Sequence, residues 1–473
     1  MGSFIGTSLM GMTYLVSGIP RYFFGDDILL LNASRSPDGY ASSIVGCVGE
    51  VGMGKWRPAF VCAVTPMLKL FGDRYWCYFL LNLVLVFFVC VVAGNLLQKV
   101  AVLSNWNVAL FALVLPFSRF AWYGRISPYG LMEFGALLFA LLFLSQFMSA
   151  LKRQTLSSWY LAGGLACFSS LFHERYLVLL AAGFSVAIIN AKNKRVQVPI
   201  IPWFVYAACY LGIKLFVLRI DPLAGGGEKT LRSSANTWIL EHFFVGIKAI
   251  IGIGDGTNIA FDTSGYLRLT ELSMLGVIWP LVLGLVILVV IRIKSMTNRG
   301  SVVSTSEIQT ELVEQQIVMR LLLLMSGLFL ILPASTIISR IEGRWLLGPE
   351  VLLLILMISI LKARTWRFIL LFCYLLLGIT CLRFLPSYEE PVRTTNEILE
   401  YVHQQLDGRT EMRYTIIDPR GRSQQLTWQL GYGDIFAQIG VSSALYVDEA
   451  SCTSSCVRIV FEDSRRFNLV TNP

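Results

Sequence analysis

Two adjacent carboxylates, Asp26 and Asp27, follow the first apolar stretch of the chain. An ionised group beside hydrocarbon loses its hydration unless it is paired or faces water, so acids at this place are costly to keep. The same loop continues to the basic run Gly54-Lys55-Trp56-Arg57-Pro58. The pattern indicates a reaction site at a membrane surface, in which one acid could act as a general base and Arg57 could bind an anion. The competing interpretation is an ion pair that ties the acids to Arg21 or Arg57.

Further charged residues lie within or beside apolar stretches. Glu133 falls inside one, where an acid is a functional candidate by default, although pairing with Arg125 or Arg119 would also explain it. His173, Glu174 and Arg175 form a charged run that is either a substrate contact or a tight polar hairpin between short helices.

A second candidate anion site is formed by two late arginines. Arg340 and Arg344 are four residues apart, so a continuous helix would place them on one face, where a guanidinium can grip a phosphate with two hydrogen bonds. Snorkelling towards lipid headgroups is the alternative.

The composition requires a membrane to surround these residues. Of the 473 residues, 55% are hydrophobic and 15% charged, and the mean hydropathy is +0.64. Such a chain cannot form an ordinary soluble globule, so we expect a polytopic membrane protein. The net charge of +9 is spread over short loops rather than one face, which disfavours nucleic-acid binding.

The hydropathy predicts an all-α membrane domain over residues 1–385, with about eleven helices near the ~17–25 residues that a bilayer requires. The expected spans are 3–18, 75–97, 101–117, 128–150, 158–172, 176–190, 199–218, 272–293, 317–338, 345–361 and 368–384. Alternate loops carry positive residues close to helix ends, as the positive-inside rule expects of cytoplasmic loops. These are Lys99, Lys152, Arg153, Lys192, Lys194, Arg195, Arg292, Lys294, Arg299, Lys362, Arg364 and Arg367. An odd number of spans then puts the amino terminus in the cytoplasm, and the acidic loop and the tail on the far side.

Residues 386–473 are expected to form a small extracytoplasmic α/β domain. A helix over 395–406 and strands over 414–418, 443–447 and 457–462 are predicted from the pattern. Cys452 and Cys456 lie in a polar part of this tail, so a disulfide is expected if the compartment is oxidising. In the loops of the membrane domain, 59–70 is expected to be an interfacial amphipathic helix and 301–316 a solvated one.

The order of the early motifs resembles the opening of the GT-C class of membrane glycosyltransferases. The resemblance rests on the acid pair, on Gly54-Lys55-Trp56-Arg57-Pro58, and on the segments 68–72 and 78–84 that follow. His173-Glu174-Arg175 and the late segment 342–349 are similar to further motifs of that class.

The resemblance implies transfer of a sugar from a polyprenyl-phosphate donor to a glycan or other acceptor on the extracytoplasmic face. It implies Asp26 or Asp27 as the base, with Asp26 slightly preferred, and a bacterial inner membrane with the site facing the periplasm, as in O-antigen and other lipopolysaccharide modification. No cofactor is certain, and the carboxylate pair would serve with or without Mg²⁺ or Mn²⁺.

Two other classes fit a polytopic chain. One is a transporter or flippase of lipid-linked glycans, for which the paired, interrupted spans of such proteins are not evident. The other is a non-catalytic subunit of polysaccharide assembly, in which the acid pair would be dispensable.

Overall fold

The computed structural model gives the architecture over most of the chain. The described residues are 1–17, 26–35, 56–72, 74–101, 103–121, 125, 127–191, 197–219, 243, 246–247, 250, 307–336, 343–361, 363–382, 396–404, 411–417, 430–441, 443–452, 456–461 and 467–471.

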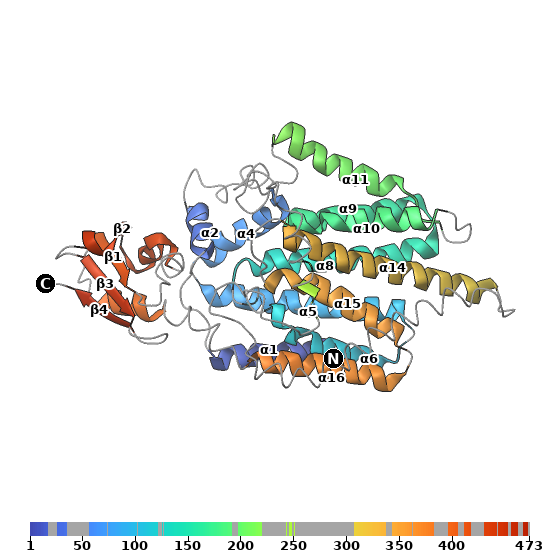
Figure 1. Cartoon of the computed structure of the whole chain (residues 1–473), viewed down its shortest axis with the longest axis horizontal. Helices are drawn as coiled ribbons and strands as arrows, with labels where there is room; N and C mark the ends of the chain where they lie inside the picture. Colours follow the sequence, from blue (N-terminus) through green and yellow to red (C-terminus); the bar gives the residue numbers. More distant parts are fainter. Residues whose placement is uncertain are drawn as a thin grey trace.

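A bundle of helices with similar axis directions makes up the larger part of these residues (Figure 1). Its helices are α1 (Gly2–Ser17), α2 (Asp26–Arg35), α4 (Pro58–Phe71), α5 (Tyr75–Val100), α6 (Asn105–Val114), α8 (Gly130–Arg153), α9 (Leu156–Phe172), α10 (Val178–Ile189), α11 (Ile201–Gly212), α14 (Glu307–Thr336), α15 (Leu347–Ile360) and α16 (Arg364–Leu382). Each expected span that falls within the described residues lies on a helix, but three of these helices, not about eleven, are long and apolar enough to cross a membrane. The expected span 272–293 lies outside them.

Three helices of the described part are long and apolar enough to cross a membrane: α5, α8 and the Leu312–Leu332 portion of α14. Helices suit this environment because they satisfy their backbone hydrogen bonds internally. Shorter apolar helices accompany them, among them α9 and α15. The chain is therefore a mostly helical membrane protein.

Helix α8 lies at the centre of the bundle and packs against α5 and α9. Close approach to α9 depends on Gly135, where an added Cβ would lie only 2.8 Å from the ring of Phe172. Small residues allow helices to approach in this way. The contact brings the connection between α9 and α10 beside the first turn of α8.

Helix α11 ends in one turn of π-helix, η4 (Ile213–Val217). The helix expected over 59–70 is present as α4, which buries Phe60, Val61 and Leu68 and exposes Leu70. The helix expected over 301–316 is described from Glu307 onward, where it continues directly into the apolar part of α14.

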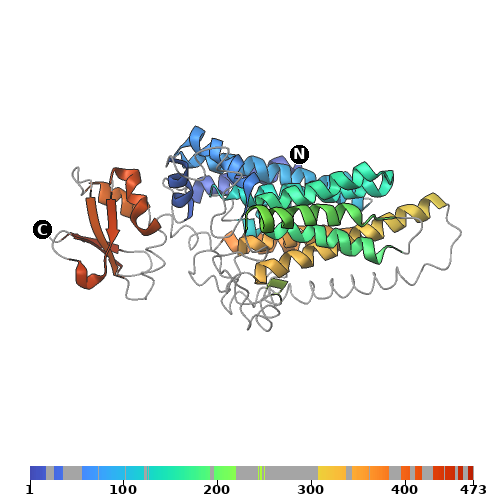
Figure 2. The same ribbon diagram turned by 90° about the horizontal axis from the view of Figure 1, so that it is seen from above.

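The tail forms a separate sheet beyond the end of the bundle that carries α2 and α4 (Figures 1 and 2). Its four strands, β1 (Glu411–Ile417), β2 (Ser443–Tyr446), β3 (Cys456–Phe461) and β4 (Phe467–Thr471), have the order β2-β1-β3-β4. β1 pairs in parallel with β2 and β3, and β3 pairs antiparallel with β4. Residues 396–404 are helical, as expected for 395–406, and the strands β1, β2 and β3 were also predicted, whereas β4 was not.

A 3-10 helix of the tail, η6 (Gly431–Ile439), packs against α2. The helix that begins with the acid pair therefore contacts both the bundle, through α4, and the tail.

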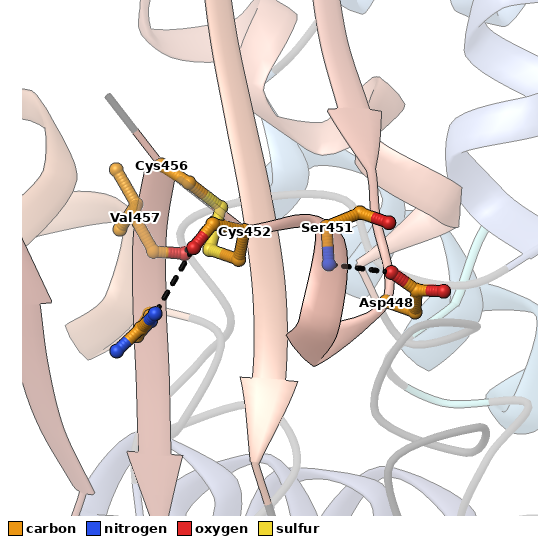
Figure 3. Close-up of a disulfide and its surroundings, with 6 residues drawn as sticks. Asp448, Ser451, Cys452, Cys456 and Val457 are labelled. Carbon is orange, nitrogen blue, oxygen red and sulfur yellow. Dashed lines mark hydrogen bonds between the residues drawn. A yellow bond between two sulfur atoms is a disulfide. The ribbon is translucent and has the colours of Figure 1, made fainter. Parts of the chain in front are cut away.

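Cys452 and Cys456 form a disulfide beside β3, with their Cα atoms 5.3 Å apart (Figure 3). Arg458 donates a hydrogen bond to the Cys452 carbonyl at 3.0 Å. Asp448 accepts from the Ser451 amide at 2.8 Å, and the hydrogen bonds from Ser451 hold the pKa of the Asp448 carboxyl below its usual value.

We expect the full chain, made in an oxidising compartment, to contain the bond between Cys452 and Cys456. Alkylation without prior reduction, followed by peptide mass spectrometry, should leave both residues unmodified, and reduction should make both reactive. Alkylation of both residues before reduction would contradict the expectation.

Candidate functional site

Several of the predicted residues meet at one end of the bundle. They come from the start of α2, the residue before α4, the first turn of α8 and the connection between α9 and α10. Packing of α4 against α8 and α9 places these segments together.

Arg57 and Glu174 form a two-pronged ion pair at this end. Nε of Arg57 lies 2.5 Å from Oε2 of Glu174, and Nη2 lies 2.6 Å from Oε1. Both side chains are nearly buried, with 14% and 11% of their surface exposed. Burial would lower the pKa of Arg57, but the Glu174 carboxylate outweighs burial and raises it. The planar guanidinium thus matches a carboxylate, and by the same geometry it could bind a phosphate.

A second buried pair joins Arg175 to Glu133. His173 lies between the two pairs, because its Nε2 is 3.8 Å from Glu133 and its Nδ1 is 3.7 Å from Glu174. The ring of Trp345 faces Arg175, with 5.9 Å between the guanidinium carbon and the ring centroid. The five residues Arg57, Glu133, His173, Glu174 and Arg175 therefore form one ionic cluster.

The ionic cluster corrects two expected pairings. Glu133 is paired with Arg175, whereas Arg125 turns away and donates to the carbonyl oxygens of Pro116 and Ser118. The charged run 173–175 lies in the short connection between α9 and α10, and Glu174 and Arg175 pair with residues of two other segments. Arg57 was a possible ion-pair partner of Asp26 and Asp27. In the structure its guanidinium pairs with Glu174 instead.

Asp27 is fully buried close to the ionic cluster. Its Oδ1 accepts from the Ser127 hydroxyl at 2.6 Å, and its Oδ2 accepts from the Tyr75 hydroxyl at 3.1 Å. Asn82 holds the segment that carries Ser127 by donating to the Ser127 carbonyl at 2.8 Å. The two hydroxyls thus fix the position of the Asp27 carboxyl group within the bundle.

The short stretch 127–133 connects Asp27 with the ionic cluster. Ser127 contacts Asp27, and its hydroxyl oxygen also accepts from the Tyr129 amide at 3.1 Å. The Tyr129 ring stacks on Phe60, one turn after Arg57, with 5.3 Å between centroids. Glu133 follows one turn after Tyr129. The acid and the ionic cluster are thus fixed by the same segment.

Three predicted residues are placed only in part. Asp26 is the first residue of α2, and its side chain falls outside the described part. Arg344 lies in η5 (Gly343–Leu346), which packs against α14; its side chain falls outside the described part. Arg340 lies outside the described residues altogether.

Some polar residues of the bundle were not singled out by sequence reasoning. Tyr75 and Ser127 donate to Asp27, and Asn82 holds Ser127 in place. Glu350 is a further buried acid, besides Asp27 and Glu133, and it accepts from the hydroxyls of Ser118 and Tyr374. Glu350 stands within an apolar span, the same signal that selected Glu133. Tyr210 and Lys214 are also buried. The hydroxyl residues gave no signal, because tyrosine and serine are ordinary in such helices.

Within the described ranges, no group of three or more His, Cys, Asp or Glu side chains is placed to hold a metal ion. The side chain of Asp26 is not among those ranges, so the expectation of Mg²⁺ or Mn²⁺ at the acid pair stays untested.

In comparisons with known proteins, the chain matches no family model, and no curated protein is detectably similar to it in sequence.

Proposed function

We propose that this protein transfers a sugar from a polyprenyl-phosphate donor to a glycan or other acceptor at the extracytoplasmic face of a membrane. The observation that supports this most is the convergence of Asp27, Arg57, Glu133 and the run 173–175 at one end of the bundle. A site for this reaction needs a carboxylate and cations, and the described residues at this end supply both.

The proposed reaction is a displacement at the sugar. The carboxylate of Asp26 or Asp27 takes the proton of the acceptor hydroxyl, and the oxygen attacks the anomeric carbon. The bond from that carbon to the phosphate oxygen breaks, and the phosphate keeps the electron pair and the lipid chain. Arg57 and Arg175 are the cations of the ionic cluster, and they are candidates to stabilise the leaving phosphate together with Arg340 and Arg344.

To stabilise the leaving phosphate, the arginines of the ionic cluster must exchange their carboxylate partners for the phosphate. Arg57 is held by Glu174 in the structure, so a phosphate would have to share or displace that carboxylate. His173 lies within 4 Å of both acids and could gain a proton as the charges rearrange.

One observation favours a different class. Each arginine of the ionic cluster already has a carboxylate partner, which is what a non-catalytic assembly subunit would need for stability alone. In that case the acid pair would be dispensable. The transporter alternative has no comparable observation in its favour.

The direct test is reconstitution of the full chain in vesicles with a panel of polyprenyl-phosphate hexoses and pentoses and a glycan acceptor. Release of polyprenyl phosphate that depends on the acceptor supports the proposal. Movement of the intact donor across the bilayer without its cleavage would favour a transporter.

We further propose a bacterial inner-membrane protein with about eleven spans and the site in the periplasm. Single-cysteine labelling with an impermeant reagent should place 19–74, 220–270 and 386–473 on one side and 192–195 on the other. Two disulfide-bonded positions, Cys62 in α4 and Cys452 in the tail, are in keeping with an oxidising far side. Labelling of the tail together with 192–195 would show that the orientation is wrong.

A further inference from the structure

Lys214 is buried where its neighbours are exposed. It lies in the π-helical turn η4 and has 1% of its surface exposed, whereas Phe216 and Val217 next to it are 81% and 71% exposed. In a membrane this is the arrangement expected of a helix whose apolar side chains face lipid and whose charge faces the interior of the protein. Charged residues placed in this way commonly lie on substrate or ion pathways.

Tyr210, one turn earlier on α11, connects Lys214 with the ionic cluster. The ammonium nitrogen of Lys214 is 6.0 Å from the centroid of the Tyr210 ring, and the ring of Trp56 approaches it at 5.4 Å. Trp56 precedes Arg57 in the chain. Tyr210 therefore contacts both Lys214 and the residue next to Arg57.

The hydroxyl of Tyr210 is an unused donor. Tyr210 is 2% exposed, and its oxygen has no hydrogen-bond partner among the described residues. Buried polar atoms nearly always have a partner, and those that lack one require an explanation. A ligand that accepts a hydrogen bond at this point would supply the missing partner.

We propose that Tyr210, Lys214 and Arg57 form a binding site for a phosphate group. The tyrosine hydroxyl donates to a phosphate oxygen, and the two cations balance its charge. The exposed apolar side chains of η4 lie beside the site on the same turn, which favours a phosphate carried by a membrane lipid over a free ion. This assignment rests on the proposed function only for the identity of the lipid.

The test measures binding alone, with no acceptor present. The full chain in detergent is titrated with a polyprenyl monophosphate and, separately, with inorganic phosphate. Tyr210→Phe removes only the hydroxyl, and Lys214→Met removes the charge at similar length. The matched controls are Tyr206→Phe, one turn earlier on α11, and Lys152→Met at the end of α8; thermal unfolding of each variant verifies folding.

We expect the affinity for polyprenyl monophosphate to fall about tenfold in Tyr210→Phe and about tenfold to a hundredfold in Lys214→Met, with both controls unchanged. The same losses with inorganic phosphate would assign the site to a soluble ion, and losses with the lipid alone would assign it to the lipid headgroup. Wild-type affinity in both variants, or no binding of either probe by the unaltered chain, would overturn the site. Lipid binding that depends on Tyr210 and Lys214 in a protein that transfers no sugar would keep the site and remove the glycosyl transfer.

Discussion

Replacing the reacting carboxylate by an amide is expected to reduce sugar transfer at least ~10²-fold, the effect typical of losing a general base. Asparagine keeps the shape of aspartate but cannot accept the acceptor proton. We therefore expect this loss in Asp26→Asn or in Asp27→Asn, while the affinity for the polyprenyl-phosphate donor changes little. The measurements are acceptor-dependent release of polyprenyl phosphate and, in parallel, donor binding.

The surroundings of Asp27 make the two variants distinguishable. In Asp27→Asn the amide oxygen can still accept one hydrogen bond, and the hydroxyl of Ser127 or Tyr75 can rotate to accept from the new amide. If Asp27 is the base, Ser127→Ala should also lower transfer, by a smaller factor, because the carboxylate loses the hydrogen bond from the Ser127 hydroxyl. If Asp26 is the base, Ser127→Ala should act mainly on stability.

Asp448→Asn is the matched control, because it makes the same chemical change in an exposed acid of the tail. It should leave transfer unchanged. Full activity in both Asp26→Asn and Asp27→Asn would end the assignment of these catalytic residues and would favour the scaffold or transporter alternative.

The helices were predictable because a backbone surrounded by hydrocarbon must satisfy its own hydrogen bonds, and a helix does so within a single segment. A run of apolar residues such as that of α5 or α8 must close its own hydrogen bonds, so length and hydropathy suffice to locate it. The parallel strands β1 and β3 were found for a related reason: both are short runs rich in aliphatic residues. β4 was missed because it begins among polar and basic residues, and its pairing with β3 is a long-range contact.

The site was predictable in its residue types but not in its partners. A charge inside an apolar stretch indicates that a partner exists, which is why Glu133 was singled out. Arg57 and Glu174 were singled out because they belong to short charged runs between apolar stretches. The sequence does not say that α9 approaches α8 closely enough to bring Arg175 to Glu133 rather than Arg125. That choice follows from helix packing at Gly135. Lys214 was overlooked because a lysine near a helix end is usually snorkelling, and only its burial shows otherwise.

Breaking one partner of the Arg57 and Glu174 pair is expected to produce the largest loss of stability among the changes proposed. Glu174→Met leaves a nearly buried guanidinium without its carboxylate, which costs on the order of 3 kcal/mol. Arg57→Met leaves the carboxylate in the same position. Each single variant should unfold at a clearly lower temperature than the unaltered chain. Arg74→Met, which removes an exposed arginine before α5, should change stability by no more than ~0.5 kcal/mol.

The double variant Arg57→Met with Glu174→Met separates an ion pair that only stabilises the protein from one that also acts on a substrate. Replacing both charges by apolar side chains removes the desolvation cost together with the attraction, so stability should return close to that of the unaltered chain. A pair that only holds α4 to the connection after α9 would then leave sugar transfer intact. A guanidinium that binds the donor phosphate would leave a stable protein with weak donor binding and little transfer. We expect the second result; a double variant that is both stable and fully active would show that Arg57 has a structural role alone.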